Sequence, residues 1–396
     1  MIDVSIIIPT YNKKRHLRLS LYALEKQTFD HSRFEVIVID DGSTDGTWRR
    51  LRKYKPPYPF RYIRNIKNTG RAASRNKGIQ LARGRVLIFL DAEILVEEDF
   101  IQKHWSYHEK EDMAVVSGVF GRFHGLYSIL HPSFNRWQFK HCYPIVRKMP
   151  LIRKRFRSSV GLSRYLKRRK KPLQLVGRRS IDNHRYTRAA FSKSYYLEHL
   201  VSRYGPELRG FHFPWISFLS GNVSVKKESF DTVGLFDESF KGYGFEDWEL
   251  GYRYFLNGYK FIAGENIVSY HQEHPVNPNT RSREHKTNHL RFFEKHRDYG
   301  IAMLVLYEIG LKNYVEINQA LDEYYRLRDD FPDKYMTYKA SFHRFCERLA
   351  QRKAIDDHFS EYDVAFESDH SDLKRLGRYP QLVSVMELQD RKRLPM

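Results

Sequence analysis

The stretch VLIFLDAEILVEEDF, residues 86–100, joins an apolar run to a pair of acids. Residues 86–90 carry no polar side chain, which is typical of a parallel strand buried on both faces. The run stops at Asp91-Ala92-Glu93, where two carboxylates flank one small residue. Two acids beside a buried strand are costly without a partner, so the pattern favours acids that hold a charged ligand over a merely polar strand end.

The residues before this stretch alternate between strand and helix patterns. Short apolar runs predict strands at residues 4–8, 35–39, 60–63 and 86–90. Between them, Asn12 predicts the N-cap of one helix, a second helix is expected from about Thr44, and small residues mark a third at 72–82. This alternation predicts an α/β fold, with a Rossmann-like, mostly parallel nucleotide-binding sheet and helices on both faces.

Three polar motifs follow the predicted strands. They are Pro9-Thr10-Tyr11, Asp40-Asp41 and Asp91-Ala92-Glu93. The carboxyl ends of parallel strands share one rim, where such sheets bind ligands, so we expect the three motifs to converge. The first strand is not followed by GxGxxG, and GxxxxGK[ST] is absent, which argues against a dinucleotide dehydrogenase and a P-loop enzyme. Carboxylates repel bare phosphate, and a divalent cation removes that repulsion, so the rim suits a nucleotide diphosphate held through a metal.

Length and composition set the outer limits. With 396 residues, of which 41% are hydrophobic, we expect one large domain with an appendage. Cys142 and Cys346 offer neither a disulfide framework nor metal-ligand spacing, which indicates free thiols in a reducing compartment. The first residues lack a signal-peptide pattern, and no apolar run approaches the roughly 20 residues that span a bilayer. We therefore expect a cytoplasmic protein, soluble or peripheral at the inner face of the plasma membrane.

Most of the net charge of +22 belongs to one segment. Residues 147–193 hold 17 Lys or Arg and a single acid, Asp182, so the rest of the chain is not expected to bind nucleic acid. Apolar residues lie among the basic ones at helical spacing, such as Ile152, Phe156 and Val160, which indicates binding to an anionic membrane surface. A polyanionic acceptor would use the same charges without a bilayer, and a solvated basic loop is the simplest alternative.

Four stretches together resemble one enzyme family. They are VSIIIPTYN (4–12), VIVIDDGSTDGT (36–47), NTGRAASRNKGI (68–79) and VLIFLDAEILVEEDF (86–100). They closely resemble the family-2 glycosyltransferases, which are inverting enzymes of the GT-A fold. Residues 219–261 resemble the acceptor-side segment of that family, and the likeness covers about 3–120 and 215–275. The family usually carries Asp-x-Asp where this chain has Asp91-Ala92-Glu93, and glutamate also ligates Mg²⁺ or Mn²⁺.

The resemblance assigns roles to the rim. It implies that residues 9–11 and the pair Asp40-Asp41 hold the uracil and ribose of a UDP-sugar. Arg71 would contact the base or the diphosphate. Asp91, next to Ala92, would contact the ribose or the metal, and Glu93 would be a direct metal ligand. For Asp40-Asp41 alone, an Asx turn that caps a helix explains the pattern equally well.

The second half of the chain supplies the catalytic base that the resemblance implies. Gly242 and Gly244 precede a predicted helix that ends at Asn257-Gly258, and Glu246 and Asp247 lie in its first turn. Acids in a first turn complement the helix dipole, which is the purely structural interpretation. The resemblance favours Asp247 as the general base that deprotonates the acceptor hydroxyl, with Glu246 orienting the acceptor or the base.

A histidine follows the base at the spacing that the family uses for a metal ligand. His271 lies 24 residues after Asp247, and the resemblance implies that it completes a Mn²⁺ or Mg²⁺ site with Glu93 and Asp91. His274 is the weaker candidate, and a purely structural histidine is the alternative. Other pocket-lining candidates are Trp215 and residues 220–222, while Trp248 suits either a sugar face or the core.

These observations predict four segments and one function. The segments are a nucleotide-sugar-binding half at 1–121, a basic insert at 122–213, an acceptor-side half at 214–283 and a helical region at 284–396. The expected function is metal-dependent, inverting transfer of a hexosyl or N-acetylhexosaminyl group from a UDP-sugar to a glycan, lipid-linked or glycoprotein acceptor, in bacterial surface polysaccharide synthesis. A nucleotidyltransferase is one alternative, although its Gly- and Lys-rich triphosphate loop is missing. The other is a non-catalytic polyanion-binding protein.

Overall fold

The computed structural model describes residues 1–119, 122–192, 196–275, 278–351 and 364–390. The chain divides into two compact units. The first unit comprises Met1–Leu208 and Trp215–Ser282, and the second comprises Arg209–Pro214 and Arg283–Met396. The predicted rim motifs and residues 122–208 of the basic insert belong to the first unit, whereas residues 209–213 of the insert belong to the second.

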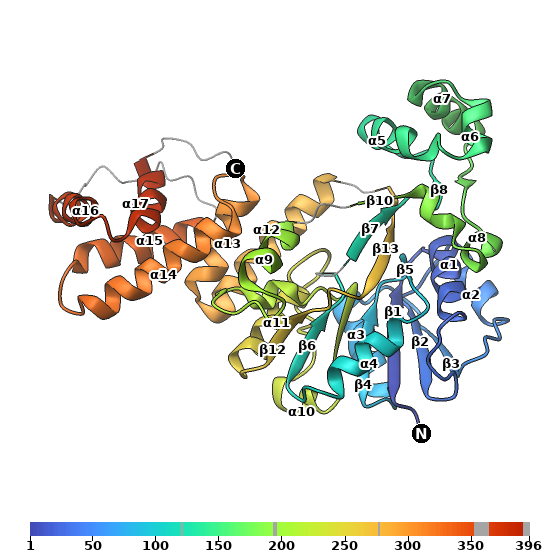
Figure 1. Ribbon diagram of the computed structural model, residues 1–396, viewed down its shortest axis with the longest axis horizontal. Coiled ribbons are helices and arrows are strands. Elements are labelled where there is room, and N and C mark those ends of the chain that lie inside the picture. The colour runs from blue at the N-terminus through green and yellow to red at the C-terminus, as the bar shows by residue number, and fades with distance from the viewer. Residues whose placement is uncertain (120–121, 193–195, 276–277, 352–363, 391–396) are drawn as a thin grey trace. The chain divides into compact units, whose positions relative to one another are not determined.

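A seven-stranded sheet forms the centre of the first unit (Figure 1). Its order is β12 (Lys260–Ala263), β6 (Ala114–Ser117), β11 (Asn222–Lys226), β4 (Val86–Leu90), β1 (Val4–Thr10), β2 (Phe34–Asp40) and β3 (Phe60–Arg64). Neighbouring strands pair in parallel, except that β11 runs antiparallel to both β4 and β6. The predicted α/β class with a mostly parallel sheet is confirmed.

Helices cover both faces of this sheet. The helices of the first half are α1 (Lys14–Leu24), α2 (Thr47–Leu51), α3 (Arg71–Leu81) and α4 (Phe100–His108). A Cβ atom on Gly78 of α3 would lie 2.4 Å from Ile7, so the missing side chain lets α3 approach β1 closely. The His104 side chain of α4 is hydrogen-bonded to Ser224 of β11. Ser224 and Ile6 both pair with Ile88 of β4, so they lie on the same face of the sheet. Ile7, the next residue of β1, points to the other face. The helices α3 and α4 therefore lie on opposite faces.

Two local predictions are wrong in detail. The N-cap of α1 is Lys13 rather than Asn12, which adopts φ +55° and accepts the Thr44 backbone N–H at 2.8 Å. Asn12 thereby links the loops after β1 and β2. The helix expected near Thr44 begins at Thr47, where Asp45 accepts the backbone N–H at 3.0 Å.

A smaller sheet connects the two halves of the first unit. Its order is β10 (Ala190–Ser192), β7 (Arg122–Leu126), β13 (Val268–Gln272) and β5 (Ile94–Val96). Residues 260–272 contribute to both sheets, because β12 belongs to the seven-stranded sheet and β13 to the smaller one. The pairing of β13 with β5 places His271 opposite Ile94, the residue after Glu93.

The insert folds around its own core. We call α5 (Arg136–Val146), α6 (Pro150–Arg155) and α7 (Ser159–Arg169) the basic lobe, which Figure 1 shows projecting beyond β8 (Ile129–Leu130). After it come β9 (Leu173–Gln174), α8 (Arg178–Asp182) and η1 (Arg185–Ala189). Ile152, Leu162 and Leu166 have no exposed surface, and Phe156 is 8% exposed, because they pack on one another and on α5. Most of the apolar stripe inferred from the sequence is therefore internal, although Val160 is 56% exposed, and binding to a membrane surface stays a prediction.

The rest of the described chain is mainly helical. The first unit also contains α9 (Tyr196–Tyr204), η2 (Pro214–Ser217), α10 (Ser229–Val233) and α11 (Glu246–Leu256). The C-terminal elements are α12 (Pro278–His296), α13 (Tyr299–Glu308), α14 (Tyr314–Asp330), α15 (Met336–Gln351), α16 (Val364–Leu376), α17 (Pro380–Met386) and η3 (Glu387–Asp390). The predicted helical C-terminal region is confirmed. None of the helices that the structure describes combines the length and the apolar character needed to cross a membrane.

Candidate active site

The ends of β1, β2 and β4 bring the three sequence motifs to one rim. β1 pairs in parallel with β2 as far as Thr10 and Asp40, and β4 lies on its other side. Thr10 is buried, and its hydroxyl has no hydrogen-bond partner among the described residues, whereas Tyr11 is 48% exposed. A buried hydroxyl without a partner is rare in proteins, so Thr10 is suited to a polar ligand at this rim. Pro9 precedes it within β1, and Ala92 is buried beside the acids of β4.

Asp40 and Asp41 shape the rim loops. The Asp40 carboxylate accepts the Ser43 backbone N–H at 2.9 Å and the Tyr62 hydroxyl at 2.5 Å. Asp41 accepts four hydrogen bonds of 2.8–2.9 Å from the loop 65–70, which leads into α3. Asp40 thus holds the loop after β2 but does not cap α2, whose N-cap is Gly46, and a direct nucleotide contact of either acid stays a prediction.

Arg75 ties the rim to the second half of the chain. Its side chain is only 2% exposed, and its two terminal nitrogens donate to Glu246 Oε1 at 3.0 Å and to Asp91 Oδ1 at 3.2 Å. The guanidinium carbon also lies 5.5 Å from the centroid of the Phe236 ring, within the roughly 6 Å of a cation–π contact. One buried cation thereby joins α3, the end of β4 and the start of α11.

Asp247 has the properties of a proton acceptor. Its carboxylate accepts the Ser220 backbone N–H at 3.3 Å and hydroxyl at 3.2 Å on one oxygen, and the Trp248 backbone N–H at 3.0 Å on the other. Burial, together with the neighbouring Glu246 carboxylate, raises the pKa of Asp247 to about 7, against the opposing effect of Arg75. A carboxylate with a pKa near neutrality both holds and releases a proton at working pH.

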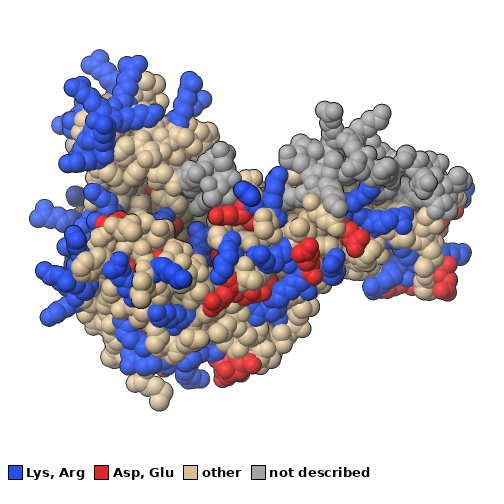
Figure 2. All heavy atoms as spheres, turned by 180° about the vertical axis from the view of Figure 1, so that it is seen from behind, with Lys and Arg blue, Asp and Glu red and all other residues tan. Residues whose placement is uncertain are grey.

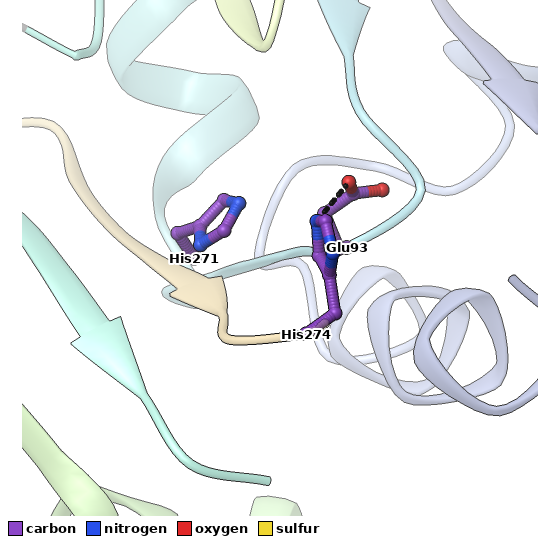
Figure 3. Close-up of side chains that lie close together, drawn as sticks. All are labelled: Glu93, His271 and His274. Atoms are coloured by element: carbon purple, nitrogen blue, oxygen red, sulfur yellow. Dashed lines mark ion pairs between the residues drawn. The ribbon is translucent and has the colours of Figure 1, made fainter. Parts of the chain in front are cut away.

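Glu93, His271 and His274 form a compact group (Figure 3). Each offers one ligand atom, and these atoms lie within 4.8 Å of one another. Glu93 Oε1 lies 3.1 Å from His274 Nε2, and His271 reaches the group from the end of β13. Asp91, predicted as a further ligand, is not a member of the group, because its Oδ1 accepts Arg75. His274, the weaker candidate from the sequence, is the one that contacts Glu93.

The donor set of this group fits a divalent cation. The Nδ1 atom of His271 lies 3.1 Å from Glu273 Oε1, and Nδ1 of His274 lies 2.9 Å from the Pro275 carbonyl oxygen. Metal-ligating histidines use such outer contacts to fix the ring and direct the other nitrogen to the metal. One carboxylate and two imidazoles make a mixed oxygen and nitrogen donor set, in which the carboxylate suits Mn²⁺ or Mg²⁺ and the imidazoles suit later first-row ions such as Fe²⁺ and Zn²⁺.

Lys13 is already a cationic partner of Glu93. Its ammonium nitrogen lies 2.9 Å from Glu93 Oε1. Burial alone would raise the pKa of Glu93, but Lys13 and His274 hold it well below its usual value. Burial also lowers the pKa of the neighbouring His16 to about 3, so this imidazole is neutral and adds no charge. The Glu93 carboxylate is therefore ionised and ready for a cation.

The remaining predicted residues divide between the rim and the core. Arg71 begins α3, where its guanidinium lies 5.4 Å from the Tyr243 ring centroid, so the rim position is as expected. Trp215 is 1% exposed and packs edge-on against Trp248, so it supports the site from the core instead of lining a pocket. The indole N–H of Trp248 is buried without a hydrogen-bond partner in the described chain. In the segment 220–222, the Gly221 carbonyl accepts the Asp91 backbone N–H at 3.1 Å.

Two site residues, Lys13 and Arg75, were missed by the sequence reasoning. Arg75 stands one helical turn after Arg71 in the segment 68–79, so the i, i+4 spacing would have placed both on one face. Lys13 directly follows the first rim motif, but a single lysine at a helix start carries no distinctive pattern. Its role depends on Glu93, 80 residues away.

The comparisons with known proteins agree with the geometry. The family model "Glycosyl transferase family 2" matches residues 5–165, and the model "N-terminal domain of galactosyltransferase" matches residues 205–275. These two ranges contain the rim motifs, the acids at the start of α11 and His271.

The chain belongs to glycosyltransferase family 2.

This family-2 chain has both characterised and uncharacterised relatives. It is 35% identical over 277 residues to "Uncharacterized glycosyltransferase YfnE" of Bacillus subtilis (strain 168), covering 69% of this chain and 65% of the relative. It is 29% identical to validoxylamine A glucosyltransferase of Streptomyces hygroscopicus subsp. limoneus, and the match covers 74% of this chain and 56% of the relative. It thus spans about three fifths of the length of these curated relatives. The chain also matches a solved structure, mannosyltransferase PcManGT from Pyrobaculum calidifontis in complex with GDP-Man and Mn²⁺. The TM-score is 0.49 at 16% sequence identity, and the match covers 90% of this chain and 88% of that structure.

Proposed function

We propose that this protein is an inverting glycosyltransferase that moves a hexosyl or N-acetylhexosaminyl group from a UDP-sugar to a hydroxyl of a glycan acceptor. The observation that supports this proposal most strongly is the presence of two chemically distinct groups in the first unit, a proton acceptor and a cation-binding group. Asp247, with its pKa near 7, is suited to accept a proton, and the Glu93–His271–His274 group is suited to hold a cation. The named relatives that transfer sugars support the same reaction class.

Inversion needs one displacement at the anomeric carbon. The acceptor hydroxyl attacks from the face opposite the diphosphate and passes its proton to Asp247 Oδ2 or Oδ1 as the new bond forms. Ser220 and the Trp248 backbone hold that carboxylate in position. Glu246 cannot take part freely as a base, because Arg75 binds it. Its charge instead favours the protonated form of Asp247.

The leaving diphosphate would be held by the other end of the rim. A Mn²⁺ or Mg²⁺ ion, when bound by Glu93, His271 and His274, supplies charge that stabilises the departing diphosphate. Lys13 and Arg71 add two fixed cations near the same carboxylates. In this proposal the buried Thr10 hydroxyl, which has no hydrogen-bond partner in the described chain, and the exposed Tyr11 ring would contact the nucleoside.

Nucleotide release tests this proposal. We expect the protein to release UDP slowly from one or a few UDP-sugars, and to lose that activity with EDTA and regain it with Mn²⁺ or Mg²⁺. Glu93→Gln keeps the side-chain shape and removes the charge, so metal-dependent UDP binding in calorimetry should be lost. Glu98→Gln, outside the rim, is the matched control. Unchanged UDP affinity of Glu93→Gln in Mn²⁺ would contradict the metal assignment, and a failure of every UDP-sugar to bind would contradict the donor class.

A further inference from the structure

The basic lobe presents an unusually dense set of exposed cations. Residues 147–171 contain seven arginines, five lysines and no acid. All twelve are exposed: Arg147, Lys148, Arg153, Lys154, Arg155, Arg157, Arg164, Lys167, Arg168, Arg169, Lys170 and Lys171. Figure 2 shows these blue side chains covering the projecting lobe. Nearly half of this segment therefore carries positive charge on the surface.

The protein does not neutralise these charges internally. Within the part of the chain that the structure describes, none of the twelve takes part in an ion pair, whereas basic side chains nearby do. Arg178, just after the lobe, pairs with Glu25 at 2.6 Å, and Lys26 pairs with Asp182 at 3.0 Å. Such self-repulsion among like charges costs stability, so the arrangement is suited to a partner that supplies many negative charges.

The shape of the lobe argues against two classes of partner. A bilayer would need a broad exposed apolar face, but Ile152, Leu162 and Leu166 are inside the lobe core, and Val160, at 56% exposed, is a single side chain. Single-stranded nucleic acid stacks its bases on aromatic rings, but Phe156 is buried and Tyr165 lies under the Arg155 guanidinium at 4.3 Å. Trp137 of α5 is 68% exposed, and its ring stacks on that of His141. A polyanion that binds chiefly through charge matches most of what is exposed.

The lobe is also joined to the candidate active site. Gln138 of α5 donates to the His274 carbonyl oxygen at 3.1 Å, next to the proposed metal group. The Glu273 backbone N–H donates to the Leu126 carbonyl oxygen at 2.8 Å, at the end of β7. An acceptor chain bound on the lobe would thus be held by the same element that positions His274.

A basic cavity continues this surface at the foot of the lobe. It has a volume of about 630 Å³, and five of its ten lining residues are Lys or Arg: Lys14, Arg15, Arg18, Arg49 and Arg50. Gln174 also lines it and bonds Arg18 at 3.0 Å. Lys171 is three residues before Gln174, so their Cα atoms lie within about 11 Å of each other. The C-terminal end of the lobe segment therefore lies near the cavity, whose lining also includes one acid, Asp45.

We propose that the basic lobe and this cavity bind a polyanionic glycan chain, and that this chain is the acceptor of the transfer reaction. The inference rests on the proposed function, because an acceptor site presupposes transfer. Arginines outnumber lysines on the lobe, and an arginine side chain can donate two parallel hydrogen bonds to one phosphate or carboxylate group. An acceptor with a negative group in each repeat therefore suits this surface. Its hydroxyls would then reach Asp247 from a chain held at many points.

Binding of a model polyanion by the full chain tests the inference. The probe is labelled long-chain inorganic polyphosphate, followed by fluorescence anisotropy over a series of salt concentrations. We expect Lys167→Gln/Arg168→Gln/Arg169→Gln to weaken binding by about tenfold, and to reduce the slope of log Kd against log salt by about 2, since each lost phosphate contact contributes about 0.7. The matched control is Lys110→Gln/Lys286→Gln/Lys334→Gln, which removes three exposed charges elsewhere and should change neither quantity.

UDP binding, measured on the same proteins, separates this inference from the proposed function. It should be unchanged in both triple variants, because the substituted residues lie outside the rim. If the unsubstituted protein does not bind UDP, the donor assignment is contradicted, whereas the polyanion site on the lobe is not. Equal polyphosphate affinity of the two triple variants would overturn the lobe site. Binding to anionic vesicles without binding to polyphosphate would assign the lobe to a membrane, and tighter binding of a DNA duplex at equal phosphate concentration would assign it to nucleic acid.

Discussion

At the scale of single residues, Asp247 and Glu93 are both partly buried acids, but their surroundings shift their pKa values in opposite directions. Asp247 lies beside the Glu246 carboxylate, so its proton is retained to higher pH. Glu93 lies between Lys13 and His274, so its proton is lost at lower pH. The sequence showed both acids as strand-end or helix-start carboxylates and could not show this difference, because the deciding neighbours come from distant segments.

Asp247→Asn keeps the shape of the side chain and removes the proton acceptor. We expect turnover to fall by roughly 10²–10⁴, while UDP affinity stays unchanged, because the donor is held by other residues. Steady-state kinetics and calorimetry on the same preparation check this. Glu246→Gln is the informative comparison: near-normal turnover of Asp247→Asn, combined with a large loss in Glu246→Gln, would move the base to position 246.

The raised pKa of Asp247 also predicts a pH dependence. The base acts only when it is deprotonated, so kcat/KM should fall tenfold per pH unit below about pH 7 and level off above it. The folded protein keeps this proton to higher pH than the unfolded chain does, so the contribution of Asp247 to stability declines as pH rises from about 4 to about 7. Asp247→Asn should therefore gain more in Tm over the unsubstituted protein at pH 8 than at pH 4. Equal Tm differences at both pH values would contradict the assigned pKa.

Lys13 occupies the position next to Glu93 that a divalent cation needs. Replacing it by methionine removes the competing ammonium and keeps the length, so we expect Mn²⁺ to bind about tenfold more tightly without nucleotide, which corresponds to ~1.4 kcal/mol. Titration followed by Mn²⁺ electron paramagnetic resonance measures this directly. Lys26→Met, beyond the other end of α1, should leave the affinity unchanged. Weaker Mn²⁺ binding of Lys13→Met would mean that Lys13 helps to hold the site together.

At the scale of elements, the sequence predicted β1, β2, β3 and β4 but missed the short β5. The prediction was strongest for β1, β2 and β4, because largely apolar runs mark buried parallel strands. It also predicted that their ends would meet. It did not predict the connection between α3 and α11, because Arg75 and Glu246 are 171 residues apart and neither belongs to a local pattern. The lobe core was missed for a related reason: periodicity shows that an apolar face exists, but not what covers it.

The connection between α3 and α11 should be important for stability. Arg75→Met leaves the Glu246 carboxylate buried without its cation, so we expect a loss of about 3–5 kcal/mol in the free energy of unfolding. Lys103→Met, which breaks the partly exposed pair with Asp99 on the same unit, should cost less than about 1 kcal/mol. Urea denaturation of both variants checks the contrast. A similar small loss in both would show that Arg75 contributes to the site only through its charge.

At the scale of the whole molecule, the sequence showed where the excess positive charge lies, and the structure showed which side chains of that segment are exposed. The run of basic residues was evident from counting, and its assignment to one segment was sound. Whether its apolar residues faced outward depended on how three short helices pack, which no single-sequence pattern determines. The structure shows that most apolar side chains of the lobe are internal and that all twelve basic side chains are exposed, whereas Trp137 and Val160 are apolar side chains that stay exposed.

The position of β11 has a consequence for how the chain matures during synthesis. This strand lies between β4 and β6, yet it is made about 130 residues after β4 ends. At about 5–20 residues per second, the free edge of β4 waits roughly 7–26 s for its partner to leave the ribosome. During that interval the nascent sheet presents a continuous apolar edge strand, Val86–Leu90, to other chains. A ribosome that stalls between the two strands would therefore release a fragment prone to aggregation, and chaperones that shield strand edges should bind this protein most strongly before residue 222 is made.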